Sequence, residues 1–286
     1  MDALVQLKRG DNDASKRWGG NTLATAPAYT VKALQQDLKA VGTFTDTENG
    51  IFGPKTEKAL KLFQWTCANI DKCLKNNTAT TRTKKATIKV SGVLDKASND
   101  ELQLWIKNSQ AVTGDLIRIP FSDLTNIEAG PSFKKLSSAK VFKDEIVISK
   151  EAKKLLTDLN GQAKDKSVTI KINQAFREHG VKVTGSVVAP ASKSQHLIGH
   201  ALDCNIVDGG SWNNSSDFKN NKQTKNAKEL IAALKKAGYR WGGDFTPTDT
   251  PHFDAKLDAA TFAYDAMFFL NQRMISEGHD IPKDKP

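Results

Sequence analysis

The chain has 286 residues, of which 42 are basic and 32 acidic, for a formal net charge of +10 at pH 7. At roughly 150 residues per domain this length predicts about two domains. The 38% of hydrophobic residues suffices for at least one sizeable core, and 19 glycines with nine prolines exclude a collagen-like or low-complexity chain. The positive charge favours a polyanionic partner. It is spread over both halves without a basic tail, so we expect no nucleic-acid partner.

The sequence contains no run of about 18 apolar residues that could span a bilayer. Residues 1–9 lack the apolar region of a signal peptide, which predicts synthesis in the cytoplasm without the ordinary secretory route. The odd number of cysteines does not suggest a disulfide framework and favours small buried side chains. Cys67 and Cys73 could still bridge a local loop in an oxidising compartment.

Apolar spacing in the first half predicts helices over 31–41, 55–64 and 99–107. Thr30 is placed to cap the first helix and Gly42 to end it. Residues 66–91 are rich in Thr, Asn and Lys, so we expect an insertion there, with a short strand-like stretch at its end.

The second half alternates helix and strand patterns. We expect helices over 149–159, 223–237 and 259–275, and strands at 168–173, at the end of 196–207, at 239–241 and at 252–254. The absence of regular βαβ spacing favours an α+β class over a doubly wound sheet. The expected architecture is a small three-helix domain over 1–115, a linker over 116–140, and an α+β domain with a small antiparallel sheet over 141–286.

Two separate segments carry residues suited to a metal site. His196 and Asp203 are seven residues apart, and Gly199 between them permits a bend that would let both converge. His252 lies in the second segment. Two histidines and one carboxylate would leave zinc a position for water, and zinc lowers the pKa of such water towards about 7. Asp249 is then the candidate to take the proton.

Spacing alone leaves two other interpretations open. His196 and His252 can be structural histidines with satisfied hydrogen bonds. His196 and His200 are four residues apart, which suits zinc on a helix, although Gly199 weakens a helix and the glutamate of an H-E-x-x-H motif is missing.

The pattern S-x-H-x-x-G-x-A-x-D over 194–203 resembles a motif of the zinc peptidases that include D-alanyl-D-alanine carboxypeptidases and phage endolysins. The sequence W-G-G-D at 241–244, followed by D-x-P-H-F at 249–253, resembles the ending found in the L-alanyl-D-glutamate endopeptidases of that family. The resemblance covers roughly residues 120–270.

This resemblance implies that His196, Asp203 and His252 bind Zn²⁺. It also implies that Asp249 acts as general base and then donates a proton to the leaving amine. Three further residues each have a functional and a structural interpretation. Arg177 is either a ligand of the oxyanion or substrate or a surface salt-bridge residue. Ser194 is either a substrate contact or a turn residue, and Trp241 is either a substrate contact or a core aromatic residue.

The first half resembles a three-helix peptidoglycan-binding domain. The pattern V-x-x-L-Q-x-x-L-x-x-x-G occurs over 31–42, and G-x-F-G-x-x-T-x-x-A-x-x-x-F-Q occurs over 50–64. Asn49 replaces the aspartate usual before this glycine, and the 66–91 insertion exceeds the compact family form. The resemblance implies a wall-binding surface, which we place at the polar loop 46–52.

Together, the two resemblances imply a monomeric phage endolysin. Its first module would hold bacterial peptidoglycan, and its zinc site would cleave the stem peptide at the L-alanyl-D-glutamate bond. It would reach the wall in the periplasm after a separate phage protein permeabilises the membrane. A carboxypeptidase or endopeptidase acting at a D-alanyl bond is the first alternative. A non-catalytic wall-binding or virion protein with a decayed peptidase fold is the second.

Overall fold

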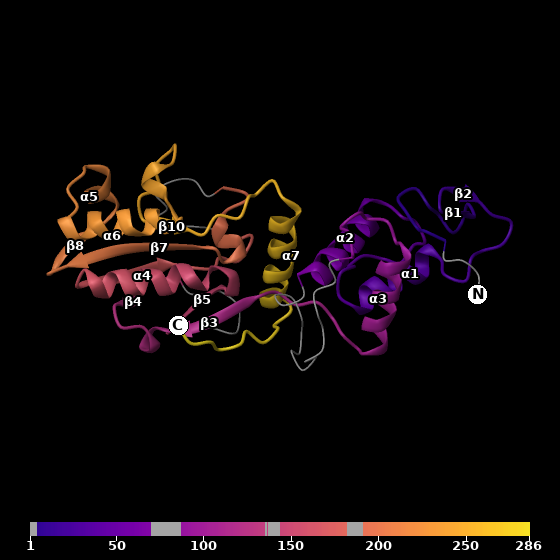
Figure 1. Cartoon of the computed structure of the whole chain (residues 1–286), viewed down its shortest axis with the longest axis horizontal. Coiled ribbons are helices and arrows are strands. Elements are labelled where there is room, and N and C mark those ends of the chain that lie inside the picture. Colours follow the sequence, from indigo (N-terminus) through magenta and orange to yellow (C-terminus); the bar gives the residue numbers. More distant parts are fainter. Residues whose placement is uncertain (1–4, 70–86, 135, 137–143, 182–190) are drawn as a thin grey trace. The chain divides into compact units, whose positions relative to one another are not determined.

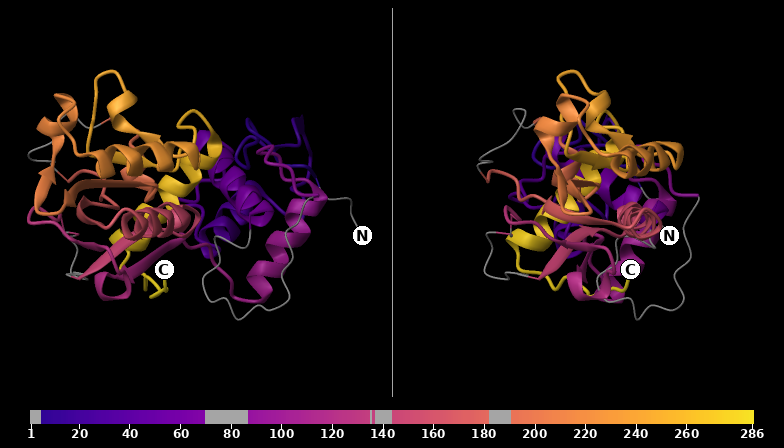
Figure 2. Two further views of the ribbon diagram at one scale, coloured as in Figure 1. Left: turned by 60° about the vertical axis from the view of Figure 1, so that its left-hand side comes forward. Right: turned by 90° about the vertical axis from the view of Figure 1, so that its left-hand side faces the viewer.

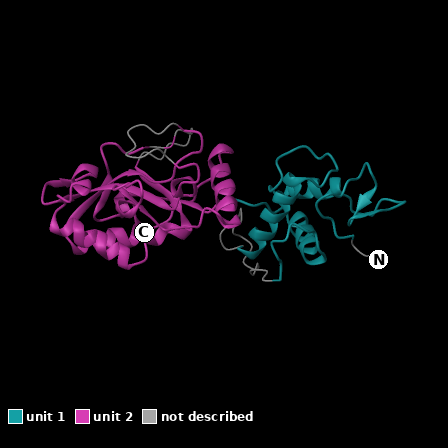
Figure 3. Ribbon diagram, turned by 90° about the horizontal axis from the view of Figure 1, so that it is seen from above, with its two compact units in different colours: residues 1–113 teal, residues 114–286 magenta. Residues whose placement is uncertain are grey.

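The computed structural model describes residues 5–69, 87–134, 136, 144–181 and 191–286. Its contacts divide the chain into two compact units, residues 1–113 and 114–286, coloured teal and magenta in Figure 3. Across the described ranges, no helix is long and apolar enough to cross a membrane.

The described part of the first unit contains the helices α1 (Val31–Ala40), α2 (Pro54–Ala68) and α3 (Lys96–Lys107) (Figure 1). The Thr30 side chain caps α1 by accepting the N–H of Ala33, and Gly42 follows the helix with a φ of 83°. Both features match the sequence prediction. The helix α3 begins earlier than expected because the Asp95 side chain accepts the N–H of Ser98 and caps it there.

Two buried glutamines of the first-half motif hold the turns between these helices. Gln35 donates from Nε2 to the carbonyl of Ile51 at 3.0 Å and accepts the N–H of Gly50 at 2.9 Å. Gln64 does the same for the turn 91–93, where it donates to the Val93 carbonyl and accepts two backbone N–H groups. The motif glutamines are therefore structural and satisfy backbone groups that would otherwise be buried without partners.

Residues 5–29, for which we predicted no helix or strand, fold against α1. They include a short hairpin of β1 (Arg17–Trp18) and β2 (Asn21–Thr22). The Asp13 carboxylate accepts the Trp18 indole N–H at 2.6 Å and the N–H of Val31 at 3.0 Å. A carboxylate at this place stabilises the N-terminus of the helix.

The expected 66–91 insertion is described only in part. Residues up to Ala68 extend α2, and residues 87–91 form no strand, contrary to the alternation at 86–90. Residues 70–86, with Cys73, lie outside the described residues, so the Cys67–Cys73 bridge that the sequence left open as an alternative lies outside them too. Cys67 is buried on α2.

The second unit is built on a sheet of six strands within the described residues. Its order is β4 (Ile127–Ala129), β6 (Val168–Gln174), β7 (Ala201–Asp208), β10 (His252–Asp254) and β9 (Arg240–Trp241), with β8 (Ser211–Asn213) also paired to β7. The pair β4 and β6 is parallel and the other pairs are antiparallel. The sheet is thus mixed, whereas the sequence predicted an antiparallel one. A second sheet pairs β3 (Leu116–Pro120) with β5 (Glu145–Ser149).

One face of the large sheet packs against α4 (Lys153–Asp165) and α6 (Lys225–Lys236), which contact one another (Figure 2). Along β6 the residues Val168, Ile170 and Ile172 are buried in this core, while those between them are partly exposed. The same alternation follows β7. Side chains of Asp203 and every second neighbour therefore emerge on the opposite face. Two further helices are α5 (Ser215–Lys219) and α7 (Phe262–Ser276).

The segment 116–140, predicted as a linker, is part of the second unit. It supplies β3, a 3-10 turn (Phe121–Asp123) and β4, and Ile117, Ile119 and Ile127 are buried in the core. These strands are too short, and too closely bounded by turn residues, to show a clear periodicity. The helix predicted from 149 likewise begins at Lys153, because β5 and a 3-10 turn occupy residues 145–152.

Gln64→Leu tests the role of the motif glutamines. Leucine has a volume similar to that of glutamine, but it cannot hydrogen-bond to the backbone of the turn 91–93. The loss of these bonds should lower the free energy of unfolding by about 2–4 kcal/mol. Gln36→Leu is the matched control, because Gln36 is exposed on α1 and we expect a change within about 0.5 kcal/mol. Urea unfolding of the full chain measures both. Equal midpoints for the two variants would contradict a structural role.

Candidate active site

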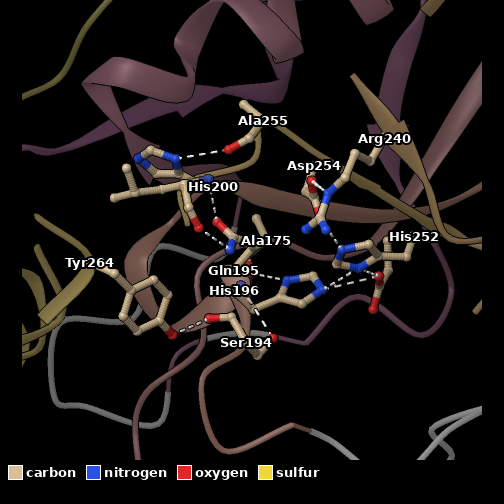
Figure 4. Close-up of polar contacts among 12 residues, drawn as sticks. Ala175, Ser194, Gln195, His196, His200, Arg240, His252, Asp254, Ala255 and Tyr264 are labelled. Atoms are coloured by element: carbon tan, nitrogen blue, oxygen red, sulfur yellow. Dashed lines mark hydrogen bonds and ion pairs between the residues drawn. The ribbon is translucent and has the colours of Figure 1, made fainter. Parts of the chain in front are cut away.

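The site forms where β7 and β10 pair. In their register His252 lies opposite Asp203, so both side chains project from the same face of the sheet. The third residue, His196, comes from a 3-10 turn (Gln195–Ile198) that directly precedes β7. Figure 4 shows the rings of His196 and His252 turned towards one another.

Three acceptor atoms converge at this point. His196 Nε2 lies 3.0 Å from Asp203 Oδ1 and 3.1 Å from His252 Nδ1, and the last two atoms are 3.1 Å apart. Among the described residues, His196, Asp203 and His252 are the group of side chains whose ligand atoms lie close enough together to hold one metal ion. Tetrahedral zinc, with bonds of about 2.0–2.1 Å, requires ligand atoms roughly 3.4 Å apart, so small side-chain movements would admit the ion.

The outer hydrogen bonds of the two rings decide which atoms face this point. His196 Nδ1 lies 2.7 Å from the Ala175 carbonyl oxygen, and His252 Nε2 lies 3.0 Å from Asp254 Oδ2 (Figure 4). Each of these contacts needs an N–H on the outer nitrogen, so each neutral ring presents a lone pair to Asp203. With both rings neutral, the three lone pairs would face one another without a hydrogen between them and would repel one another. A bound cation would turn that repulsion into attraction, so the residues fit zinc.

The pKa values of the metal-free site show the same preference for positive charge. Burial lowers the pKa of His252, but hydrogen bonds with Asp203 and Asp254 outweigh burial and raise it to about 9. Burial raises the pKa of Asp203, but the two histidines hold it well below its usual range. Protons and a metal ion therefore compete for the same position.

The sequence analysis missed the pair that orients His252. Asp254 is fully buried and accepts from Arg240 Nε at 2.8 Å and Nη2 at 2.7 Å. In the register Arg240 lies opposite Asp254, so both share the face of His252. The available signal was the spacing of two between His252 and Asp254, since alternate residues of a strand share a face.

Asp249 lies on the loop before β10 and lines the same cleft, which has a volume of about 1220 Å³. It is half-buried and is not part of the three-ligand group. Burial and the neighbouring Asp203 raise its pKa, against the opposing effect of the two histidines and Arg177. A carboxylate with a raised pKa beside a metal position is suited to general acid–base work.

Gly242 fixes the position of the Asp249 loop. Its carbonyl accepts the Asp249 N–H at 2.7 Å, and a Cβ on Gly242 would lie only 2.0 Å from the Asp249 carbonyl oxygen. No other residue type fits so close an approach. The first glycine of W-G-G-D therefore serves to hold the loop that carries Asp249.

Arg177 is buried and lines the cleft. Burial lowers its pKa, although Asp203 and Asp249 act in the opposite direction. In the part of the chain that the structure describes, no carboxylate lies within ion-pair distance of its guanidinium, which does not support the surface salt-bridge alternative. Gln272 of α7 donates to the carbonyls of Arg177 and Leu197 and so links this segment to the turn of His196.

Ser194 and Trp241 were predicted as substrate contacts. Ser194 lines the cleft, and its Oγ also accepts the His196 N–H at 3.3 Å, as expected of a turn residue. Trp241 is not among the cleft-lining residues. It lies opposite Phe253 on the core face of the sheet and donates its indole N–H to the Thr250 carbonyl at 2.8 Å. Strand alternation therefore corrects the prediction for Trp241 in favour of the core alternative.

The structure also separates His200 from the site. Gly199 has a φ of 77° and ends the turn, so His200 does not follow His196 as it would on a helix. His200 Nδ1 lies 3.0 Å from the Ala255 carbonyl oxygen (Figure 4). The alternative ligand pair of His196 and His200 is thereby excluded.

Comparisons with known families agree with this division of the chain. Residues 188–255 match the family model of D-alanyl-D-alanine carboxypeptidase. Residues 28–67 match the model of a peptidoglycan binding domain. The first match includes His196, Asp203, Asp249 and His252, and the second spans α1 and most of α2. A search of curated proteins found no match.

Metal titration tests the ligand set. We expect one zinc per chain for the full-length protein, and His196→Ala should lose it while His200→Ala keeps it, because only the former points a lone pair at Asp203. Elemental analysis after dialysis measures the stoichiometry, and circular dichroism checks the fold of both variants. Retention of zinc by His196→Ala would contradict the site.

Asp254→Asn tests the orientation of His252. The neutral amide of the variant no longer balances the charge of Arg240 or holds Nε2 of the His252 ring in place, so the affinity for zinc should fall about 10–100-fold. The matched control is Glu277→Gln, since Glu277 accepts from Arg273 in the same two-bond geometry but is exposed on the surface. Competition with a chromogenic chelator gives both dissociation constants. Unchanged affinity in Asp254→Asn would show that the pair does not support the metal.

Proposed function

We propose that the chain is a zinc-dependent peptidoglycan hydrolase that cleaves the stem peptide. The observation that carries the proposal is the meeting of three ligand atoms, from His196, Asp203 and His252, beside the carboxylate of Asp249, which is not part of that group. The two family matches support it, because a peptidase-like segment and a wall-binding segment occur in one chain.

The roles of the side chains follow from their positions around the cleft. Bound zinc would polarise a water molecule and stabilise negative charge on the scissile carbonyl. Asp249 accepts the proton of the attacking water and passes it to the departing amine, which its raised pKa favours. Arg177 donates hydrogen bonds to the oxygen that gains charge, from a buried position where such bonds are strong. Asp254 and Arg240 keep the His252 ring in place.

The first unit would supply binding to the wall. A tethered peptidase meets its substrate at a raised effective concentration, so the cleft itself can bind each stem peptide weakly. We further propose that the protein is a monomeric phage endolysin that acts on the wall in the periplasm after membrane permeabilisation. The resemblance of the W-G-G-D sequence at 241–244 and the D-x-P-H-F sequence at 249–253 to L-alanyl-D-glutamate endopeptidases supports the choice of the L-alanyl-D-glutamate bond.

The match of residues 188–255 to D-alanyl-D-alanine carboxypeptidase favours a second candidate, cleavage at a D-alanyl bond. Mass spectrometry of digested peptidoglycan distinguishes the two, because the new amino terminus identifies the bond. We expect free D-glutamate amino termini and L-alanine left on the sugar. Released D-alanine would instead establish the second candidate.

Asp249→Asn tests the catalytic assignment. Without a carboxylate to move the proton, we expect the turnover number on purified peptidoglycan to fall about 10²–10⁴-fold while bound zinc is retained. The control is Asp244→Asn, because Asp244 lies in the same motif but is exposed and paired with Lys235. Full activity of Asp249→Asn would refute the base assignment. A wild-type protein that holds zinc yet never cleaves the wall would support the non-catalytic alternative.

A further inference from the structure

An exposed tryptophan lies on the same sheet face as the metal site. Trp212 of β8 is 45% exposed and lies opposite Val207 of β7, which in turn lies opposite Thr169 of β6. Directly opposed residues share a face, so these three side chains form one row across the sheet. We call this row the Trp212 ledge.

The ledge is continuous with the cleft of the proposed active site. Asn205 lines the cleft and lies midway along β7 between Asp203 and Val207, on their face. Asn214 also lines the cleft and is two residues beyond Trp212. Four residues of a strand span roughly 13 Å, so the ledge begins about that far from the Asp203 backbone.

The chemistry of the ledge suits a sugar. An indole and a half-exposed valine offer an apolar surface, which matches the C–H face of a pyranose ring. Among the described residues, the side chains of Thr169, Asn205 and Trp212 make no hydrogen bond. These groups can therefore bind the hydroxyl groups around such a ring.

The area does not suit a second protein chain. A stable dimer buries about 800 Å² on each partner, whereas a tryptophan buries only about 150–250 Å². A single aromatic platform beside a cleft is instead the size of one or two sugar rings. The ion pair of Lys171 and Glu128 lies next along the same face and limits the apolar surface on that side.

We propose that the Trp212 ledge binds the glycan strand of peptidoglycan while the stem peptide occupies the cleft. This inference rests on the proposed function. In peptidoglycan the L-alanine is joined directly to the sugar, so cleavage of the L-alanyl-D-glutamate bond places the glycan close to the metal ligands. Trp212 is then a substrate-binding residue that selects glycan-linked stem peptides over free ones.

Binding can be tested without any hydrolysis. A peptide-free tetrasaccharide of alternating N-acetylglucosamine and N-acetylmuramic acid is titrated into the full chain, and the indole N–H signals are followed by NMR. The chain has five tryptophans, and Trp212→Phe identifies the Trp212 signal by its loss. We expect a saturable shift of that signal. A Trp212 signal that stays unchanged, or that shifts with protein concentration alone, would overturn the proposal, the latter by showing that a second copy covers the ledge.

Kinetics give the second test. Trp212→Ala should lower kcat/KM about tenfold on a disaccharide-linked stem peptide, through KM, and less than about twofold on the same peptide without sugar. Trp212→Phe should restore most of the loss, and Leu104→Ala, which removes a similarly exposed side chain from α3, should change neither substrate. Equal losses on both substrates would overturn the proposal. If the wild type cleaves neither substrate, the proposed function fails, while the indole titration still decides the ledge.

Discussion

The site depends on the convergence of three ligand atoms that the fold imposes. The outer nitrogens of His196 and His252 are committed to the Ala175 carbonyl and to Asp254, so the inner nitrogens must face Asp203. Together they favour a positive charge at this position, either a metal ion or the proton that the raised pKa of His252 retains. The surrounding structure holds the three ligand atoms about 3 Å from one another, so the fold itself favours a cation at this position.

The alternation of strand residues organises both the core and the chemistry. On β7, β10 and β9 one parity packs against α4 and α6, and the other carries Asp203, His252, Asp254 and Arg240. A shift of register by one residue would exchange the two sets. The apolar residues between the functional ones therefore fix the site, since burial of Leu202 and Phe253 decides which way Asp203 and His252 point.

Much of this arrangement could be predicted from local sequence patterns. Motif spacing brought His196, Asp203, His252 and Asp249 into one hypothesis, and helical periodicity located α1, α6 and α7 closely. The sequence alone did not predict which strands pair with one another or in which register. The place of Trp241 on the core face and the Arg240–Asp254 pair depend on the register between β9 and β10, which connects residues 14 apart or fewer but is not encoded in either strand alone. The segment 116–140 escaped prediction because its strands gain their stability from β5 and β6, not from their own periodicity.

The ligands also link metal binding to the stability of the second unit. His196 and His252 are 56 residues apart, and the unfolded chain does not hold them together. Zinc that binds the folded unit would therefore shift the folding equilibrium by mass action, and after its removal a proton on His252 would take its place beside Asp203, as the raised pKa of His252 favours. The same contacts that set affinity for the ion, from Ala175, Asp254 and Arg240, then also resist local unfolding around the cleft. Rigidity of this kind would suit the proposed hydrolase, in which Asp249 and Arg177 would have to keep their places relative to the ion while the substrate changes.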